Sequence, residues 1–316
     1  MKLVRIVIVA AAVLAALATI VAVGLHEKST AAGSHAPPAQ APVTLPATPE
    51  TYLGVYVPGV PDSYAPMTAF TTATGVRPRV TVYYSGWLEP FRTSFAATAA
   101  AHGVLPLVQI EPTGISLSAI AAGKYDGYLS SYAEAVRDYG RPVILSFGHE
   151  MNGSWYSWSN GNASPASYVA AWRHIVREFR IAGTENVTWL WTVNIIDAQT
   201  GILDPGPWWP GSSYVTWVGI DGYYATPSTT FAPLFGPTIV AVRALTSDPI
   251  LIAETGAADT ASQPAQIADA FAGIRTYGLL GLIWFDAKGK QNWRLVSPSA
   301  VAAFRQGAEA YHGPAS

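Results

Sequence analysis

Cysteine is absent from this chain of 316 residues. Its absence excludes disulfide bonds, thiolate nucleophiles and metal sites built on sulfur. Charged residues are also scarce, at 12% of the chain, and they nearly balance to a net charge of −2. A partner held by long-range electrostatics, nucleic acid above all, is therefore not expected.

Several catalytic motifs are missing or incomplete as well. His149-Glu150 is followed by Gly153 at the position where a zincin places its second histidine. No Gly-x-Ser-x-Gly elbow is present to supply a serine nucleophile. His174 lies in the middle of a predicted helix and is interpreted as a packed helix residue. We therefore expect neither a catalytic metal nor a cofactor.

The amino-terminal segment predicts export from the cytoplasm. Lys2 and Arg5 precede an uncharged apolar run, Ile6–Leu25, which has the layout of a signal peptide and is long enough to act as a signal anchor. Residues 1–25 are assigned to this element, and the Pro- and Ala-rich residues 26–50 to a linker. The folded catalytic domain is expected over residues 51–316, either secreted or anchored to the outer side of a membrane.

Short apolar runs alternate with segments of helical periodicity along this domain. Because most of the runs lack a polar side, they are typical of parallel strands covered on both faces. Helices are predicted over Tyr128–Asp138, Tyr168–Ile181, Gln266–Thr276 and Ala300–Gly307. The expected strands are Tyr52–Val57, Arg79–Tyr84, Leu105–Ile110, Pro142–Phe147, Val187–Val193, Val215–Ile220, Pro249–Ala253 and Gly281–Phe285.

Eight strand-helix units in a domain of this length predict an α/β fold, the (β/α)8 TIM barrel. The alternative is a doubly wound open sheet. It fits less well because no Gly-rich phosphate loop follows the first predicted strand. Gly54 and Gly59 could be the outer glycines of such a loop, but Tyr56 replaces the middle one and Pro58 interrupts the pattern.

Chemistry in a TIM barrel takes place at the carboxyl ends of the strands. Glu150 follows the fourth predicted strand and Glu254 follows the seventh. Strands four and seven lie on roughly opposite sides of a barrel mouth, so the two carboxyl groups can flank one bond. A gap of about 5–5.5 Å would suit a retaining glycosidase. In the alternative interpretation, each glutamate caps a helix or pairs with an arginine.

The segment Gly148–Trp158 resembles glycoside hydrolase family 26, a family of β-mannanases, β-1,3-1,4-glucanases and β-1,3-xylanases. The resemblance continues in Asn186–Trp191, Asp221–Tyr223, Ile252–Gly256 and Trp293-Arg294. It implies a retaining endo-β-glycanase that hydrolyses β-mannan or mixed-linkage β-glucan by double displacement. The implied partner is a polysaccharide, and we expect a monomer.

The same resemblance assigns roles to individual residues. Glu150 matches the acid/base and Glu254 the nucleophile. Tyr223 matches the tyrosine that binds the nucleophile. Trp155 matches a tryptophan that stacks on sugar, and His149 the histidine before the acid/base. Asp221 lies two residues before Tyr223 and is assigned with it to the substrate site.

Further substrate contacts are predicted from residues at other strand ends. Glu111 ends the third strand, where mannanases of the family usually carry a histidine, and this difference leaves the sugar open. Trp284, in the eighth strand, and Trp87, after the second, are the remaining candidates, with loop packing as the alternative for Trp87. Two other functions stay open: a glycan-binding barrel without turnover, and an enzyme that acts on a cell-envelope glycan.

Overall fold

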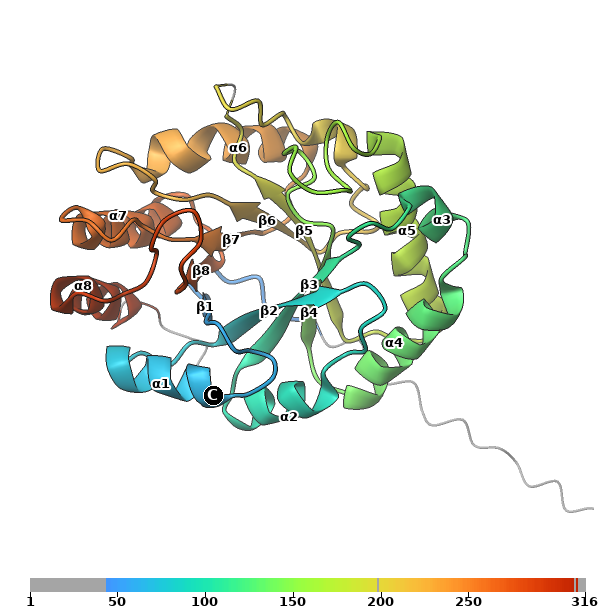
Figure 1. Ribbon diagram of the computed structural model, residues 1–316, viewed down its shortest axis with the longest axis horizontal. Helices are drawn as coiled ribbons and strands as arrows, with labels where there is room; N and C mark the ends of the chain where they lie inside the picture. Colours follow the sequence, from blue (N-terminus) through green and yellow to red (C-terminus); the bar gives the residue numbers. More distant parts are fainter. Residues whose placement is uncertain (1–43, 198, 310, 312–316) are drawn as a thin grey trace, which may run out of the picture. The chain divides into compact units, whose positions relative to one another are not determined.

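The computed structural model describes residues 44–197, 199–309 and 311. Eight parallel strands close into a barrel in chain order (Figure 1), and β1 pairs with β8 with Leu53 opposite Leu282. The predicted (β/α)8 barrel is thereby confirmed. The strands are β1 (Tyr52–Tyr56), β2 (Val80–Gly86), β3 (Leu105–Glu111), β4 (Val143–Phe147), β5 (Val187–Asn194), β6 (Trp217–Asp221), β7 (Ile250–Thr255) and β8 (Gly281–Phe285).

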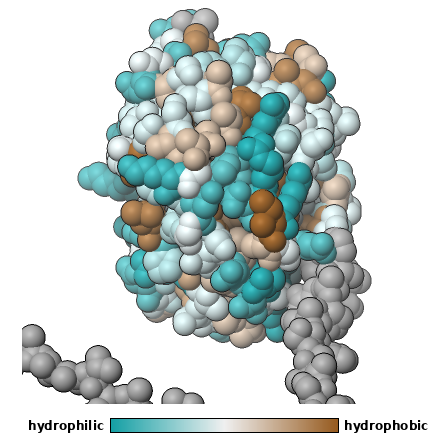
Figure 2. Space-filling model, turned by 90° about the vertical axis from the view of Figure 1, so that its right-hand side faces the viewer, coloured by the Kyte–Doolittle hydropathy of each residue, from teal (hydrophilic) through white to brown (hydrophobic). Residues whose placement is uncertain are grey.

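Helices form a ring outside the strands (Figure 1). The face that carries α3, α4 and α5 is largely hydrophilic, with scattered apolar residues (Figure 2), as expected of amphipathic helices that bury one side. Ser164 caps α5 by accepting from Ser167 N at 3.1 Å, and Pro165 begins the helix. The helices are α1 (Ala65–Thr74), α2 (Thr93–Ala101), α3 (Leu117–Ala121), α4 (Asp126–Tyr139), α5 (Pro165–Ile181), α6 (Phe231–Leu245), α7 (Gln263–Thr276) and α8 (Pro298–Glu309).

Two apolar layers explain why the strands show little alternation in sequence. Val82 and Ile283 belong to the layer inside the barrel, whereas Tyr83 and Trp284 belong to the layer between the barrel and its helices. Successive side chains of a strand point to opposite faces, so both sets are buried. This burial leaves the polar residues at the strand ends free to line the mouth.

The connection between β5 and β6 differs from the expected repeat of strand and helix. Its described part contains a short 3-10 helix, η1 (Gly206–Trp208), rather than an α-helix. Pro205, Pro207 and Pro210 explain the difference, because proline removes a backbone donor and breaks an α-helix at interior positions. Trp208 is buried, and Trp209 packs edge-on against Trp191 at 4.9 Å.

The chain joins the barrel before Thr51, where the sequence interpretation placed the start of the domain. Leu45 is buried in the layer inside the barrel, and Tyr52 Oη donates to Pro46 O at 2.7 Å. Residues 44–50 therefore pack against the amino-terminal end of the barrel, opposite the mouth.

The proposed signal segment, residues 1–25, lies outside the described residues, as does most of the linker. Among the helices that the structure describes, none is both long and apolar enough to cross a bilayer. Export, membrane anchoring and the oligomeric state stay predictions.

Candidate active site

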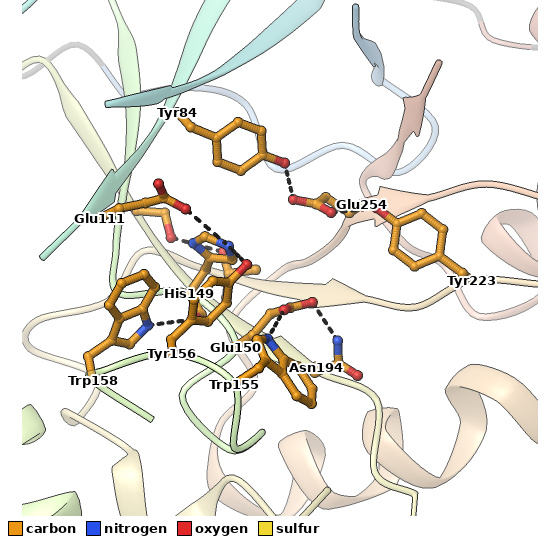
Figure 3. Close-up of polar contacts among 12 residues, drawn as sticks. Tyr84, Glu111, His149, Glu150, Trp155, Tyr156, Trp158, Asn194, Tyr223 and Glu254 are labelled. Carbon is orange, nitrogen blue, oxygen red and sulfur yellow. Dashed lines mark hydrogen bonds and ion pairs between the residues drawn. The ribbon is translucent and has the colours of Figure 1, made fainter. Parts of the chain in front are cut away.

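The carboxyl ends of β4 and β7 bring two buried glutamates into one space at the barrel mouth. Glu150 follows β4 and is 8% exposed, and Glu254 lies in β7 and is 6% exposed. Their carboxyl groups point into the same gap (Figure 3). A buried carboxylate is costly without hydrogen-bond donors, so the partners of each group decide its chemistry.

Glu254 is held by two tyrosine hydroxyl groups. Tyr84, from β2, donates to Oε1, and Tyr223, which follows β6, donates to Oε2 at 2.5 Å. Burial raises the pKa of Glu254, and the two hydroxyl groups act in the opposite direction because they stabilise the ionised form. The two donors also fix the plane of the carboxylate, as a nucleophile requires.

Glu150 has a different set of partners. Trp155 Nε1 donates to its Oε2 at 2.8 Å, and Asn194 Nδ2 donates to its Oε1. Burial and the neighbouring charge of Glu254 raise the pKa of Glu150 to about 7, against the effect of these two donors. The group can therefore hold a proton near neutral pH and release it in the same range, as an acid/base must.

The backbone at Glu150 turns the side chain into the mouth. Glu150 adopts a φ of 55°, in the left-handed region, which costs a non-glycine residue about 1–2 kcal/mol. Gly148 has a φ of 54°, and an added Cβ there would lie 3.2 Å from both Trp158 and Tyr168. Glu150 N donates to Thr192 O on β5 at 3.0 Å and anchors the turn to the barrel.

Trp155 is an aromatic platform beside Glu150. Its side chain is 44% exposed, although its Nε1 is occupied by Glu150. A Cβ at Gly153 would meet the indole ring at 2.3 Å, so this position must be glycine for the ring to lie where it does. An exposed indole that is fixed at its edge is suited to stack on a sugar ring.

The described residues include one group of three side chains with metal-ligand spacing, Asp126, His174 and Glu178. His174 Nε2 is hydrogen-bonded to Asp126 at 2.7 Å. The cluster lies between α4 and α5 in the outer ring, away from the two glutamates.

The part of the sequence that contains both glutamates matches a known family. A family model described as glycosyl hydrolase family 26 matches residues 118–263, which include both glutamates. The chain is 32% identical over 235 residues to Endoglucanase H of Acetivibrio thermocellus, covering 70% of this chain and 25% of that protein. The chain belongs to glycosyl hydrolase family 26.

Other members and solved structures extend the comparison. A beta-1,3-xylanase from Vibrio sp is 27% identical over 169 residues, covering 49% of this chain and 35% of that protein. This family 26 chain thus spans about a quarter to a third of the length of these two relatives.

A Cellulomonas fimi endo-beta-1,4-mannanase superposes with a TM-score of 0.63 at 18% identity, covering 82% of this chain and 70% of that one. The catalytic domain of a Bacillus sp. JAMB-750 endo-beta-1,4-mannanase gives 0.63 at 14% identity, covering 82% and 85%. These two likenesses show the shared fold.

The prediction that Trp284 contacts the substrate is wrong. Its side chain is 0% exposed, packs edge-on against Phe304 of α8 and donates from Nε1 to Trp293 O at 3.1 Å. Side chains alternate along β8, and the next residue, Phe285, faces the mouth instead. Phe285 stacks on Tyr56 with ring centroids 4.6 Å apart.

Asp221 and His149 are also buried too deeply to touch a sugar in this structure. Asp221 is 0% exposed and lies beside Glu254 in the register of β6 and β7. His149 is 1% exposed, and burial lowers its pKa to about 3, so the ring is neutral. Its Nε2 is hydrogen-bonded to Tyr156 Oη at 3.1 Å and lies 4.0 Å from Glu111 Oε1.

The two remaining predicted contacts differ in accessibility. Glu111 ends β3 with its side chain 26% exposed, and burial together with Glu254 raises its pKa to about 6. Trp87 is half-buried against Tyr125, Tyr128 and Phe147, with centroid distances of 5.1–5.8 Å. Glu111 therefore lines the mouth, whereas Trp87 is a packing residue, as the alternative interpretation held.

The sequence interpretation missed three polar residues of the mouth. Tyr84 binds Glu254, Asn194 binds Glu150, and Tyr156 binds His149 (Figure 3). The position of Asn194 at the end of the fifth predicted strand was a usable signal, since that is where a barrel places its chemistry. Tyr84 ended the second predicted strand and carried the same signal.

Glu150 is expected to destabilise the fold as the pH rises. Folding raises its pKa from an ordinary 4.5 to about 7, so ionisation opposes folding between these values and fully above pH 7. Glu150→Gln is therefore expected to increase the free energy of unfolding by roughly 1–3 kcal/mol at pH 8 and to leave it nearly unchanged at pH 4.

Urea unfolding from pH 4 to 8 measures this difference, with the exposed Glu185→Gln as the matched control. A gain of the same size at pH 4 and pH 8, or a loss at pH 8, would show that Glu150 is not held in its protonated form by the fold.

Proposed function

We propose that this chain is a retaining endo-β-glycanase that hydrolyses a β-linked polysaccharide by double displacement. The observation that carries the proposal is the pair of buried glutamates in one mouth with different partners. Glu254 accepts from two tyrosines, whereas Glu150 has a pKa of about 7 and lies beside an exposed indole. Two carboxyl groups with distinct environments are the requirement for this chemistry.

In the first step Glu254 attacks the anomeric carbon while Glu150 passes its proton to the glycosidic oxygen. The bond to the leaving sugar breaks, and a covalent glycosyl-enzyme forms on Glu254. The orientation of Glu254 by Tyr84 and Tyr223 keeps one oxygen aimed at the sugar. Trp155 offers the leaving sugar an apolar face next to the proton donor.

In the second step Glu150 is ionised and removes a proton from water. The water attacks the anomeric carbon, the bond to Glu254 breaks, and the product keeps the β configuration. A pKa of about 7 allows Glu150 to serve as acid in the first step and as base in the second near neutral pH.

The substrate class we propose is β-mannan or mixed-linkage β-1,3-1,4-glucan. Relatives of the chain are named as an endoglucanase, a beta-1,3-xylanase and endo-beta-1,4-mannanases. Glu111 at the end of β3, where a histidine is usual in mannanases of the family, favours the glucan over the mannan.

Release of reducing ends by the purified full-length protein tests the proposal on mannan, mixed-linkage β-glucan and β-1,3-xylan. We expect hydrolysis of at least one polymer, strongest on the mixed-linkage glucan, and none by Glu254→Ala. Binding to a polymer without release of reducing ends would contradict the proposal and favour a glycan-binding barrel. Activity that survives in Glu254→Ala would contradict the assigned nucleophile.

A further inference from the structure

A lysine from the loop after β8 reaches the aromatic platform beside the acid/base. Lys290 Nζ lies 5.6 Å from the ring centroid of Trp155. Trp155 belongs to the loop after β4, on the other side of the barrel mouth from β8. The contact thus bridges the mouth at the edge of the candidate site, within the range of a cation–π interaction.

The loop that carries Lys290 is anchored to the segments that follow β6 and β7. Gln291 Nε2 donates to Ala225 O after β6 at 2.9 Å, and Asn292 Nδ2 donates to Asp259 Oδ2 after β7 at 3.1 Å. The two donor residues, Gln291 and Asn292, directly follow Lys290 in the chain. They limit the positions that its side chain can reach, so that its contact with Trp155 costs little additional ordering.

Trp155 connects Lys290 to Glu150. The indole Nε1 donates to Glu150 Oε2 at 2.8 Å while the ring contacts the ammonium group. The indole is otherwise 44% exposed, although its ring lies against the backbone of Gly153, where an added Cβ would meet it at 2.3 Å. Lys290 is therefore a contact that restrains the exposed part of this ring.

Because Glu150 is buried, the nearby positive charge of Lys290 acts on the protonation of its carboxyl group. The carboxyl group is 8% exposed, and the positive charge of Lys290 favours its ionised form. The neutral His149 adds no positive charge. The titratable groups that face Glu150 from the strands around it are Tyr84, Glu111, His149, Tyr156, Asp221, Tyr223 and Glu254.

We infer that Lys290 is a positioning residue for Glu150: its ammonium group packs on the indole of Trp155 and holds it where Nε1 donates to the carboxyl group. This inference rests on the proposed acid/base role of Glu150. The positive charge of Lys290 also favours the ionised carboxylate of Glu150 that the second step needs.

A charge-preserving and a charge-removing substitution separate this role from simple packing. Lys290→Met keeps the length and apolar stem of the side chain but removes the charge, whereas Lys290→Arg keeps the charge. Lys288→Met is the matched control, because Lys288 is an exposed lysine two positions earlier in the same loop. Each variant is made in the full-length protein.

A ¹⁹F NMR titration of protein labelled with 5-fluorotryptophan follows the site without requiring turnover. The resonance of Trp155 is assigned by its loss in Trp155→Phe, and its shift with pH reports the protonation of Glu150. In Lys290→Met the apparent pKa of Glu150 is expected to rise by about half a unit, because the substitution removes a positive charge that favours the ionised carboxylate. Lys290→Arg and Lys288→Met should match the wild type.

The pH profile of kcat/KM on the active polymer gives the second readout. In Lys290→Met its basic limb should move upward by a similar amount, and kcat/KM at pH 6 should fall by about 2- to 5-fold, the value of one exposed cation–π contact. Lys290→Arg should recover both properties.

An unchanged titration in Lys290→Met, or the same change in Lys290→Arg, would overturn the inference. If the wild type hydrolyses no polymer, the proposed function fails, while the ¹⁹F titration still decides whether Lys290 acts on Glu150.

Discussion

Replacing Glu254 by alanine is expected to reduce hydrolysis of the active polymer by about 10⁴-fold or more while the protein stays folded. The size of the loss follows from the mechanism, because without this carboxylate no covalent intermediate forms and water must attack directly. Glu254 is 6% exposed, and Tyr84 and Tyr223 orient its carboxylate, so the substitution removes the group that both tyrosines hold in place. Initial rates of reducing-end release measure the effect.

The matched control is Glu89→Ala, which removes a carboxylate that is 46% exposed on the loop after β2. It should keep wild-type rates. Sodium azide should restore part of the activity of Glu254→Ala on an activated aryl β-glycoside and give a product of α configuration, since azide enters the space left by the carboxylate. A loss below tenfold would assign the nucleophile to another residue.

Glu150→Ala is expected to show a loss that depends on the leaving group. Polymer hydrolysis should fall by about 10²- to 10⁴-fold, the usual contribution of general acid/base catalysis. The dinitrophenolate of a dinitrophenyl β-glycoside needs no proton in order to leave. The first step on this substrate should therefore proceed at nearly the wild-type rate, and the glycosyl-enzyme should accumulate. A burst of dinitrophenol, measured by stopped flow, checks this expectation.

Glu111→Ala provides the comparison for Glu150, because it removes a carboxylate from the same mouth, one that is 26% exposed. It should lower the rates on polymer and aryl glycoside together and produce no burst. Equal losses on both substrates in Glu150→Ala would indicate a binding role and contradict its assignment as acid/base.

The barrel could be predicted from the sequence because its strands are buried on both faces. Runs such as Pro142–Phe147 show no polar side, and this pattern separates a parallel barrel from an antiparallel sheet. The helix predicted over Tyr168–Ile181 falls within α5, whose start at Pro165 lies three residues earlier, and the strand ends beside Glu150 and Glu254 could also be located. The β5–β6 connection could not, since a long proline-rich loop replaces its α-helix.

Side-chain direction limited the prediction of the site. Trp284 and Phe285 are adjacent aromatics at the end of β8, and composition does not tell which of them faces the mouth; the pleat of the strand places Trp284 outward. Depth was the second limit. His149 and Asp221 lie at strand ends but below the surface of the mouth.

Contacts across the barrel were the third limit, because they depend on packing rather than on local pattern. Tyr84 and Glu254 are 170 residues apart in the chain. Lys290 and Trp155 meet from loops on different sides of the mouth. Neither pair leaves a periodic signal in the sequence.

The most direct test of the nucleophile is to trap the covalent intermediate. The Glu150→Ala protein, whose second step is slowed, is incubated with 2-deoxy-2-fluoro-β-glycosyl fluorides of the gluco and manno series and then digested for peptide mass spectrometry. Double displacement at Glu254 predicts one added glycosyl group on the peptide that contains Glu254, with fragmentation placing it on that residue. A label on Glu111 or another residue, or no label in a protein whose wild type hydrolyses the polymer, would contradict the double displacement at Glu254.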